Sequence, residues 1–290
     1  MLLTKHKKLT AKSKQKKTSK KMDYRNLSTE EKERYQFDDD MRFPTSDSFV
    51  RGNEALWEQG GMQEESMALF VKGAEAGCVS SMNNVMGELT NEGKFHHALA
   101  WALEAAIRGG RGGIMILNDC YAASNNIYSQ KAHALSMYWT RMLYERGPES
   151  VDIQAADQLE DDIGKKCFQC GRKDSKNKVI LKACSMCNFY FYCNEKCQLN
   201  HWKEGKHRGE CHQLSLLNKY HKPYAKEIRD KIIRGDDPKL IKELQTLRRK
   251  LGLTRPRDEY DDESLFKNNF FLLVARNDGT VWCGSIPKVI

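Results

Sequence analysis

The arrangement of cysteine and histidine between residues 167 and 211 constrains this chain more than any other feature of its sequence. Each short pair of such residues can occupy two corners of a tetrahedron, so four pairs fit two tetrahedral zinc ions. Both ions would be surrounded by protein ligands and would keep no open position, which indicates structural rather than catalytic zinc. The four pairs are Cys167 and Cys170, Cys184 and Cys187, Cys193 and Cys197, and His207 and Cys211.

Other features of the sequence favour a reducing compartment. The start of the chain has two leucines followed by a lysine-rich run, so the apolar centre of a secretory signal is missing. The longest apolar run, residues 270–275, has six residues, whereas a membrane span needs roughly 20. In reducing compartments closely spaced thiols usually hold metal. We therefore expect an intracellular protein, in the nucleus or the cytoplasm, without membrane contact.

Positive charge is concentrated at the start of the chain. Residues 1–21 hold nine lysines and no acid, whereas residues 22–290 sum to zero. A balanced body is poor evidence for a nucleic-acid-binding surface, so contact with nucleic acid or acidic partners is expected only from this basic tail. Residues 1–45 are otherwise interpreted as a solvated, disordered arm or as a nuclear import signal.

The pattern of apolar residues from about residue 49 to 147 is helical. Four stretches place apolar residues at steps of three and four, and one of them runs from Phe95 to Ile107. Residues 68–77 align with residues 100–109, and both end on glycine, which suits a helix C-terminus. Such helix pairs resemble Sel-one-like and tetratricopeptide repeats, and the resemblance implies a solenoid scaffold for peptides or proteins over residues 46–150. An ordinary helical bundle is the alternative.

Further helices are predicted over residues 213–255. Leu240, Ile241, Leu244, Leu247 and Leu251 form an apolar stripe there, and Gly252 ends it. Residues 265–290 contain two apolar runs joined by Asn-Asp-Gly, which predicts a β-hairpin that packs against the helices. The predicted fold is mainly α: a solenoid-like helical-repeat region, a small two-zinc segment, and a C-terminal β-hairpin.

The ligand order over residues 163–212 resembles the MYND finger. Tyr192 before Cys193, Gln198 after Cys197, and the adjacent His201 and Trp202 match that family's pattern. Spacing alone does not decide which pairs share an ion, but the resemblance implies interleaved sites. The first ion would take Cys167, Cys170, Cys193 and Cys197, and the second would take Cys184, Cys187, His207 and Cys211.

One spacing departs from the family. Two residues usually separate the tryptophan from the ligand histidine, whereas four residues, 203–206, separate them here. His207 is favoured as the ligand because it lies four residues before Cys211, so that one helix turn brings both to the same ion. His201 and His212 are the alternatives, but the first lies ten residues before Cys211 and the second is its immediate neighbour.

The resemblance also implies a peptide-binding site. In MYND fingers that recruit co-repressors, a proline-rich peptide lies along the short strand beside the second cysteine pair. It meets a serine, a glutamine and a tryptophan, which correspond here to Ser185, Gln198 and Trp202. A flat indole can stack on proline rings, although Trp202 could instead be a core residue. The aromatic residues 189–191 depart from the family, so the groove could be wider, filled, or suited to another peptide.

The sequence does not support either of two enzyme classes that contain this kind of finger or a similar one. Some MYND fingers lie within SET-domain methyltransferases, but the Asn-His-x-Cys-x-Pro-Asn signature is missing, and so is the Cys-x-His-x-x-Cys centre of a RING ubiquitin ligase. We therefore expect a non-enzymatic, zinc-binding adaptor for protein–protein interaction, whose finger binds an extended peptide, with proline-rich peptides as candidates, beside a helical-repeat scaffold. The alternative is a nuclear regulator whose basic tail contacts nucleic acid. Removing zinc should unfold residues 167–211 and leave the helical repeats folded.

Overall fold

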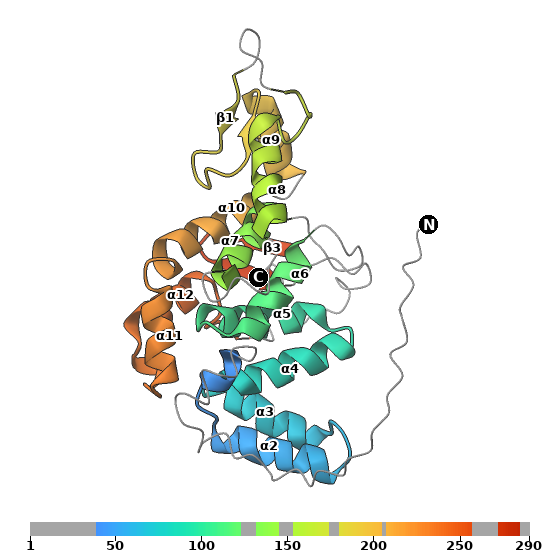
Figure 1. Cartoon of the computed structure of the whole chain (residues 1–290), viewed down its shortest axis with the longest axis vertical. Helices are drawn as coiled ribbons and strands as arrows, with labels where there is room; N and C mark the ends of the chain where they lie inside the picture. Colours follow the sequence, from blue (N-terminus) through green and yellow to red (C-terminus); the bar gives the residue numbers. More distant parts are fainter. Residues whose placement is uncertain are drawn as a thin grey trace. The chain divides into compact units, whose positions relative to one another are not determined.

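The computed structural model describes residues 39–122, 132–144, 153–173, 180–204, 207–256 and 272–284. These residues belong to one compact unit, which spans residues 37–290. Most of them are helical, which confirms the mainly α prediction (Figure 1). No helix in these described ranges is long and apolar enough to cross a membrane. Residues 1–38, which make up most of the predicted basic tail of residues 1–45, lie outside the described residues.

The first part of the described chain is a succession of α-helices. Each helix from α2 to α7 packs against the next one in the sequence, as Figure 1 shows for α2 to α5. Short connections between neighbouring helices of this kind are typical of helical repeats and bundles. The bounds are α2 (Asp47–Glu58), α3 (Glu64–Glu75), α4 (Val79–Asn91), α5 (Phe95–Ile107), α6 (Arg111–Tyr121) and α7 (His133–Tyr144).

The folded part begins before the predicted boundary at residue 46. A short 3-10 helix, η2 (Asp39–Arg42), precedes α2, and Phe43 after it is buried. The Asp40 carboxylate accepts hydrogen bonds from the backbone N–H groups of Arg111 and Gly112 at the start of α6. A carboxylate at a helix N-terminus satisfies free donors and favours the helix dipole. Residues 39–43 therefore help to fix α6.

The two glycines that mark the sequence repeat have a structural role. Gly77 and Gly109 follow the ends of α3 and α5 and have positive φ angles of 100° and 92°. Residues other than glycine rarely adopt this conformation. A Cβ atom on Gly77 would lie 2.7 Å from the Pro238 ring, and one on Gly109 would lie 2.8 Å from the Arg229 stem. The two helix ends are therefore the places where the C-terminal helices pack closely.

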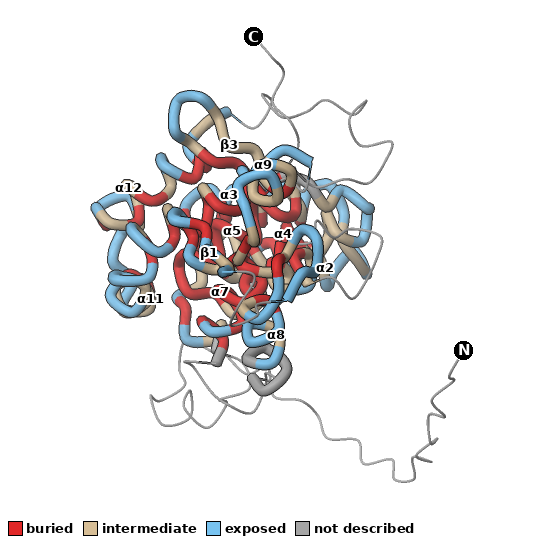
Figure 2. The backbone as a smooth tube through the Cα atoms, turned by 90° about the horizontal axis from the view of Figure 1, so that it is seen from above, coloured by how far each residue is buried: buried red, intermediate tan, exposed pale blue. Residues whose placement is uncertain are grey.

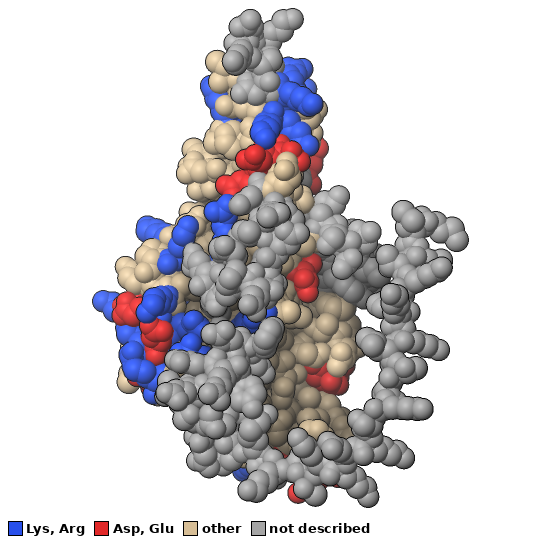
Figure 3. Space-filling model, viewed as in Figure 1, with Lys and Arg blue, Asp and Glu red and all other residues tan. Residues whose placement is uncertain are grey.

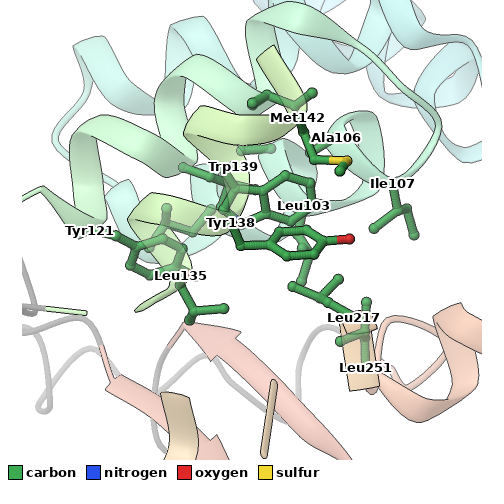
Figure 4. Packing of buried hydrophobic residues seen from close by; sticks show 14 of the residues in the cluster. Leu103, Ala106, Ile107, Tyr121, Leu135, Tyr138, Trp139, Met142, Leu217 and Leu251 are labelled. Carbon is green, nitrogen blue, oxygen red and sulfur yellow. The ribbon is translucent and has the colours of Figure 1, made fainter. Parts of the chain in front are cut away.

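Seen from above, buried residues gather towards the middle of the folded part, on α3, α4, α5 and α7 (Figure 2). Trp139 of α7 is fully buried and lies with Leu103 of α5 and Leu217 in the same cluster (Figure 4). Beside it, the buried Glu104 carboxylate of α5 forms ion pairs with Arg108 and Arg248. Because an unpaired buried charge is costly, this pairing holds the C-terminal helices against α5.

After the zinc-ligand segment the chain is helical again. The elements are α10 (His207–Leu216), η4 (Leu217–His221), α11 (Ala225–Ile233), η5 (Pro238–Leu240) and α12 (Lys242–Lys250). The predicted apolar stripe is interrupted, because Ile241 has a ψ of 98° and separates η5 from α12. As a result Leu240 is 81% exposed, whereas Leu244, Leu247 and Leu251 are fully buried.

The predicted β-hairpin is confirmed. Strands β3 (Leu272–Ala275) and β4 (Val281–Gly284) pair antiparallel, and Gly279 in the turn has a φ of 78°. The hairpin packs against α10 and α5. Contact with α10 is so close that a Cβ atom on Gly209 would lie 1.9 Å from the Leu273 carbonyl oxygen. Only a glycine fits at that point of α10.

Candidate metal centre

The structure brings the eight predicted ligands together in two groups of four. Their candidate ligand atoms lie within 4.8 Å of one another in each group. The first group is Cys167, Cys170, Cys193 and Cys197, and the second is Cys184, Cys187, His207 and Cys211. The chain enters each group twice with residues of the other group between, so the two sites are interleaved as the resemblance implies.

The distances between these ligand atoms suit a tetrahedral zinc ion. With Zn–S bonds of about 2.3 Å, two thiolates of a tetrahedral site lie about 3.8 Å apart. In the first group the Sγ atoms of Cys170 and Cys193 are 3.6 Å apart, and in the second the Sγ atoms of Cys184 and Cys211 are 3.7 Å apart. The Cys187 Sγ to His207 Nε2 distance is 3.5 Å, close to the roughly 3.6 Å expected for a sulfur and a nitrogen on one zinc ion.

Tight backbone turns position the first two cysteine pairs. Cys167 and Cys184 begin tight turns in which their carbonyl oxygens accept from the N–H groups of Gly171 and Asn188, both at 2.8 Å. Gly171 and Asn188 have positive φ angles of 71° and 55°, which close these turns. Strands β1 (Lys182–Ala183) and β2 (Phe191–Tyr192) then pair antiparallel and hold the turns side by side.

The remaining ligands are placed by helices. Cys193 directly follows β2, and Cys197 lies in the first turn of α9 (Glu195–Lys203), where the Asn194 side chain caps its backbone N–H at 2.9 Å. His207 and Cys211 are the first and fifth residues of α10, so that one helix turn aligns them. Two strands and two helices thus converge on the two sites.

The thiols of the second group could not all be charged without a cation. Hydrogen bonds from the thiols of Cys187 and Cys211 hold the pKa of Cys184 far below its usual range. The same contact with Cys184 raises the pKa of Cys187 to about 11 and the pKa of Cys211 well above its usual range. A divalent cation at the centre removes this conflict by compensating several thiolates at once.

The structure also distinguishes the candidate histidines. His207 directs Nε2 to Cys187, while its Nδ1 lies 3.1 Å from the Tyr192 hydroxyl. Burial lowers the pKa of His207 to about 4, so the imidazole is neutral, as a zinc ligand must be. His201 is stacked on His207 with the ring centroids 4.8 Å apart, and its Nδ1 is 2.7 Å from the same Tyr192 hydroxyl. His201 therefore supports the ligand histidine from outside the group of four.

The family model of the MYND finger matches residues 167–211. Residues 167–211 are a MYND finger. Searches of the curated proteins and of the solved structures gave no match to the chain. MYND fingers are zinc-binding protein-interaction modules, and the two groups of ligands in this finger are sites for two structural zinc ions.

The two zinc sites of the MYND finger differ in accessibility. All four ligands of the second site are buried, whereas Cys170 of the first site is exposed and Cys193 and Cys197 are half-buried. Burial raises the pKa of Cys167, but hydrogen bonds from the backbone of Cys170 and Cys193 outweigh it and lower the pKa to about 6. The first site is therefore the one that solvent and chelators reach more easily.

The aromatic residues that depart from the family pattern do not fill the predicted groove. Tyr190 is fully buried in the MYND finger, with its ring centroid 4.5 Å from Phe168 and 4.9 Å from His201. Phe189 packs edge-on against Tyr190 at 5.1 Å. This aromatic cluster forms a core between the two zinc sites, which a segment this short otherwise lacks.

One contact of the MYND finger was missed in the sequence. Glu210, next to the ligand Cys211, is buried, and its carboxylate accepts from the Tyr190 hydroxyl at 2.8 and 2.9 Å. The same carboxylate accepts from the backbone N–H groups of Ala134 at 2.8 Å and Leu135 at 3.3 Å. These two residues begin α7, so Glu210 caps a helix of the repeat region and links it to the finger.

The three predicted peptide-binding residues line one groove on the MYND finger. Its volume is about 620 Å³, and Ser185, Gln198 and Trp202 all contribute to its walls. The other lining residues are Cys184, Met186, Glu195, Lys196 and Leu199. Trp202 is half-buried, with its ring 5.7 Å from that of His207 and 5.8 Å from that of His212. The tryptophan therefore both packs on the second zinc site and forms part of the groove.

Proposed function

We propose that this chain is an adaptor whose MYND finger binds an extended, proline-containing peptide in the groove formed by Ser185, Gln198 and Trp202. The observation that supports the proposal is that these three residues, from two separate segments, line the same hollow. The half-buried indole of Trp202 offers a flat surface for a proline ring, while the Gln198 amide can hydrogen-bond the backbone of an extended peptide.

The groove also has the apolar floor that a peptide needs. Met186 and Leu199 line it and are 43% and 49% exposed, which is unusual for large apolar side chains on a small finger. Strand β1, which leads into this groove, pairs only with β2 among the described strands. Its other edge suits backbone hydrogen bonds to an added peptide strand.

Both zinc ions contribute to the shape of the groove. One wall, Cys184 to Met186, belongs to the turn that supplies ligands to the second site, and the other wall lies on α9, which supplies Cys197 to the first site. Each wall is thus fixed by a different ion. The structural zinc would act in binding by preorganising the groove, because a rigid site loses less entropy when a ligand binds.

The helices give the MYND finger its fixed attachment. Through Glu210 the finger is bonded to the start of α7, and through Gly209 it contacts the hairpin. In the proposed adaptor the finger binds one peptide, while the helical-repeat scaffold presents a second surface to another protein.

The test is a peptide array with the full chain, followed by affinity measurements with the best ligand. Trp202→Ala should weaken binding about thirtyfold, because a buried aromatic anchor is commonly worth about 2 kcal/mol or more. Trp202→Phe should keep part of the stacking surface and lose less. Trp57→Ala removes a tryptophan that is 81% exposed on α2, outside the groove, and is the matched control.

Zinc content must be measured for each variant by native mass spectrometry, since Trp202 also packs on His207. Unchanged affinity in a Trp202→Ala chain that holds two zinc ions would contradict the proposal. The same conclusion would follow if the array yielded no extended, proline-containing ligand.

A further inference from the structure

Charge is segregated along the chain, although residues 22–290 sum to zero. Residues 22–162 carry 24 acidic and 12 basic residues, whereas residues 212–256 carry 12 basic and five acidic residues. The second range runs from within α10 to just beyond α12. Lysine and arginine gather over α11 and α12, with a few acidic side chains among them (Figure 3). The balanced total therefore conceals a basic region in the folded part of the chain.

The exposed residues of α12 are all basic. Lys242, Arg249 and Lys250 are exposed and lie seven and eight residues apart, so they share one helix face. They make no ion pair with any residue in the described ranges. Arg248, by contrast, turns inward and pairs with the buried Glu104. Lys242 is attracted to the neighbouring Glu243, and Arg249 and Lys250 lie in the last turn of the helix, while all three side chains stay exposed.

A second basic segment lies next to α12. η4 packs against α12, and residues 219–224 around its end read Lys-Tyr-His-Lys-Pro-Tyr. Lys219 and Lys222 are exposed, the Lys219 ammonium lies 5.1 Å from the centre of the Tyr220 ring, and Tyr224 is 40% exposed. Cations that alternate with accessible aromatic rings are typical of surfaces that follow a single nucleic-acid strand, because the cations bind phosphates and the rings stack on bases.

We propose that these residues form a binding surface for single-stranded nucleic acid, independent of the peptide groove. The surface, here named the basic face, consists of Lys219, Lys222, Tyr224, Lys242, Arg249 and Lys250. Its cations would bind the phosphate backbone without reading the base sequence, and Tyr224 would stack on a base.

The packing of α12 favours nucleic acid over a lipid surface. A helix that lies in a membrane interface inserts an apolar face among the lipids. The apolar face of α12, formed by Leu244, Leu247 and Leu251, is fully buried in the protein core. Among the described residues beside these cations, the exposed large apolar ones are Leu240, at the preceding η5, and Tyr224. A ridge of cations with one leucine and one tyrosine suits a phosphate backbone better than acyl chains.

The test is the fluorescence anisotropy of a fluorescein-labelled oligothymidylate titrated with the full chain at about 50–200 mM salt. The first variant reverses the outward charges of α12: Lys242→Glu, Arg249→Glu and Lys250→Glu. Losing three phosphate contacts should reduce the slope of log K against log salt by about 2 and the affinity at about 0.1 M salt about a hundredfold.

The matched control changes the net charge equally elsewhere. Arg42, Arg51 and Lys72 are exposed on η2, α2 and α3, and their triple change to Glu should alter the slope little. The basic tail is present in both triple variants, so its contribution cancels in the comparison. Tyr224→Ala should cost about tenfold in affinity through lost stacking, while Tyr224→Phe should bind like the native chain.

Several results would overturn the proposal. They are no binding by the native chain, an equal loss in both triple variants, and an unchanged slope in the α12 variant. The chain could also sediment with phosphatidylserine vesicles. If this vesicle binding depended on the α12 cations and oligothymidylate binding did not, the basic face would be assigned to lipid. Salt-sensitive self-association that depends on the same cations, without oligothymidylate binding, would assign it to a second copy.

Discussion

Replacing Glu210 with alanine tests whether the MYND finger and the helices fold as one body. The substitution removes the carboxylate that accepts from the Tyr190 hydroxyl and from the backbone N–H groups of Ala134 and Leu135, and leaves Ala134 only its 3.3 Å contact with the Tyr190 hydroxyl oxygen. All three donors belong to buried residues, so bulk water does not replace the lost partner. Each unsatisfied donor costs about 1–3 kcal/mol. Because the buried carboxylate is itself costly to desolvate, we expect a total loss of about 3–6 kcal/mol.

Thermal unfolding of the full chain measures this loss. For a chain of this size each kcal/mol lowers Tm by about 2–4 °C, which gives a decrease of roughly 6–24 °C. Hydrogen exchange should accelerate at the start of α7, although the finger still holds two zinc ions by native mass spectrometry. Glu210→Gln retains an acceptor and should lose less, and Glu54→Ala, exposed on α2, should change Tm little.

A Glu210→Ala chain that melted within about 2 °C of the native chain, with unchanged exchange at Ala134 and Leu135, would refute this reasoning. The finger would then be a separate module that only touches the helices.

Three further predictions concern the ligands and the packing around them. Native mass spectrometry should show two zinc ions per chain, and a chelator should remove the more exposed first ion before the second. Hydrogen exchange should show that α2 to α5 stay helical during this treatment. Simultaneous loss of both ions would contradict the difference in burial between the two sites. His207→Ala should lose one zinc ion and His201→Ala should keep both, so the opposite counts would exchange their roles. Gly209→Ala should lower Tm because its Cβ atom would collide with Leu273. An added Cβ atom on Gly87 in α4 would have no neighbouring atom within 4 Å. Gly87→Ala should therefore raise the free energy of unfolding by up to about 1 kcal/mol.

The local features of the fold could be predicted from the sequence. The zinc ligands lie in pairs that are close in the chain, so their spacing in the sequence predicts two tetrahedral zinc sites. The assignment of pairs to ions came from the family resemblance, and the distances in the structure agree with it. Helix periodicity and the Asp278-Gly279 turn are likewise local, since a helix face or a tight turn depends on neighbouring residues.

Contacts between distant segments could not be predicted in the same way. Glu210 bonds to Ala134, 76 residues away, and nothing near either residue in the sequence signals the other. Gly209 reads as an ordinary residue between two ligands, although its lack of a side chain admits the hairpin. The basic face was missed because a charge total ignores position. Leu240 was assigned to a buried stripe because periodicity does not show where a helix begins.

In the proposed function the groove of the MYND finger binds the peptide, and the helical repeats do not. Chemical-shift mapping of the isotope-labelled full chain, titrated with the proline-containing peptide selected from the array, tests it most directly. We expect the amide signals that move to belong to residues 183–186 and 195–203, which include the groove lining. Shifts confined to α2–α7, with the finger unchanged, would contradict it.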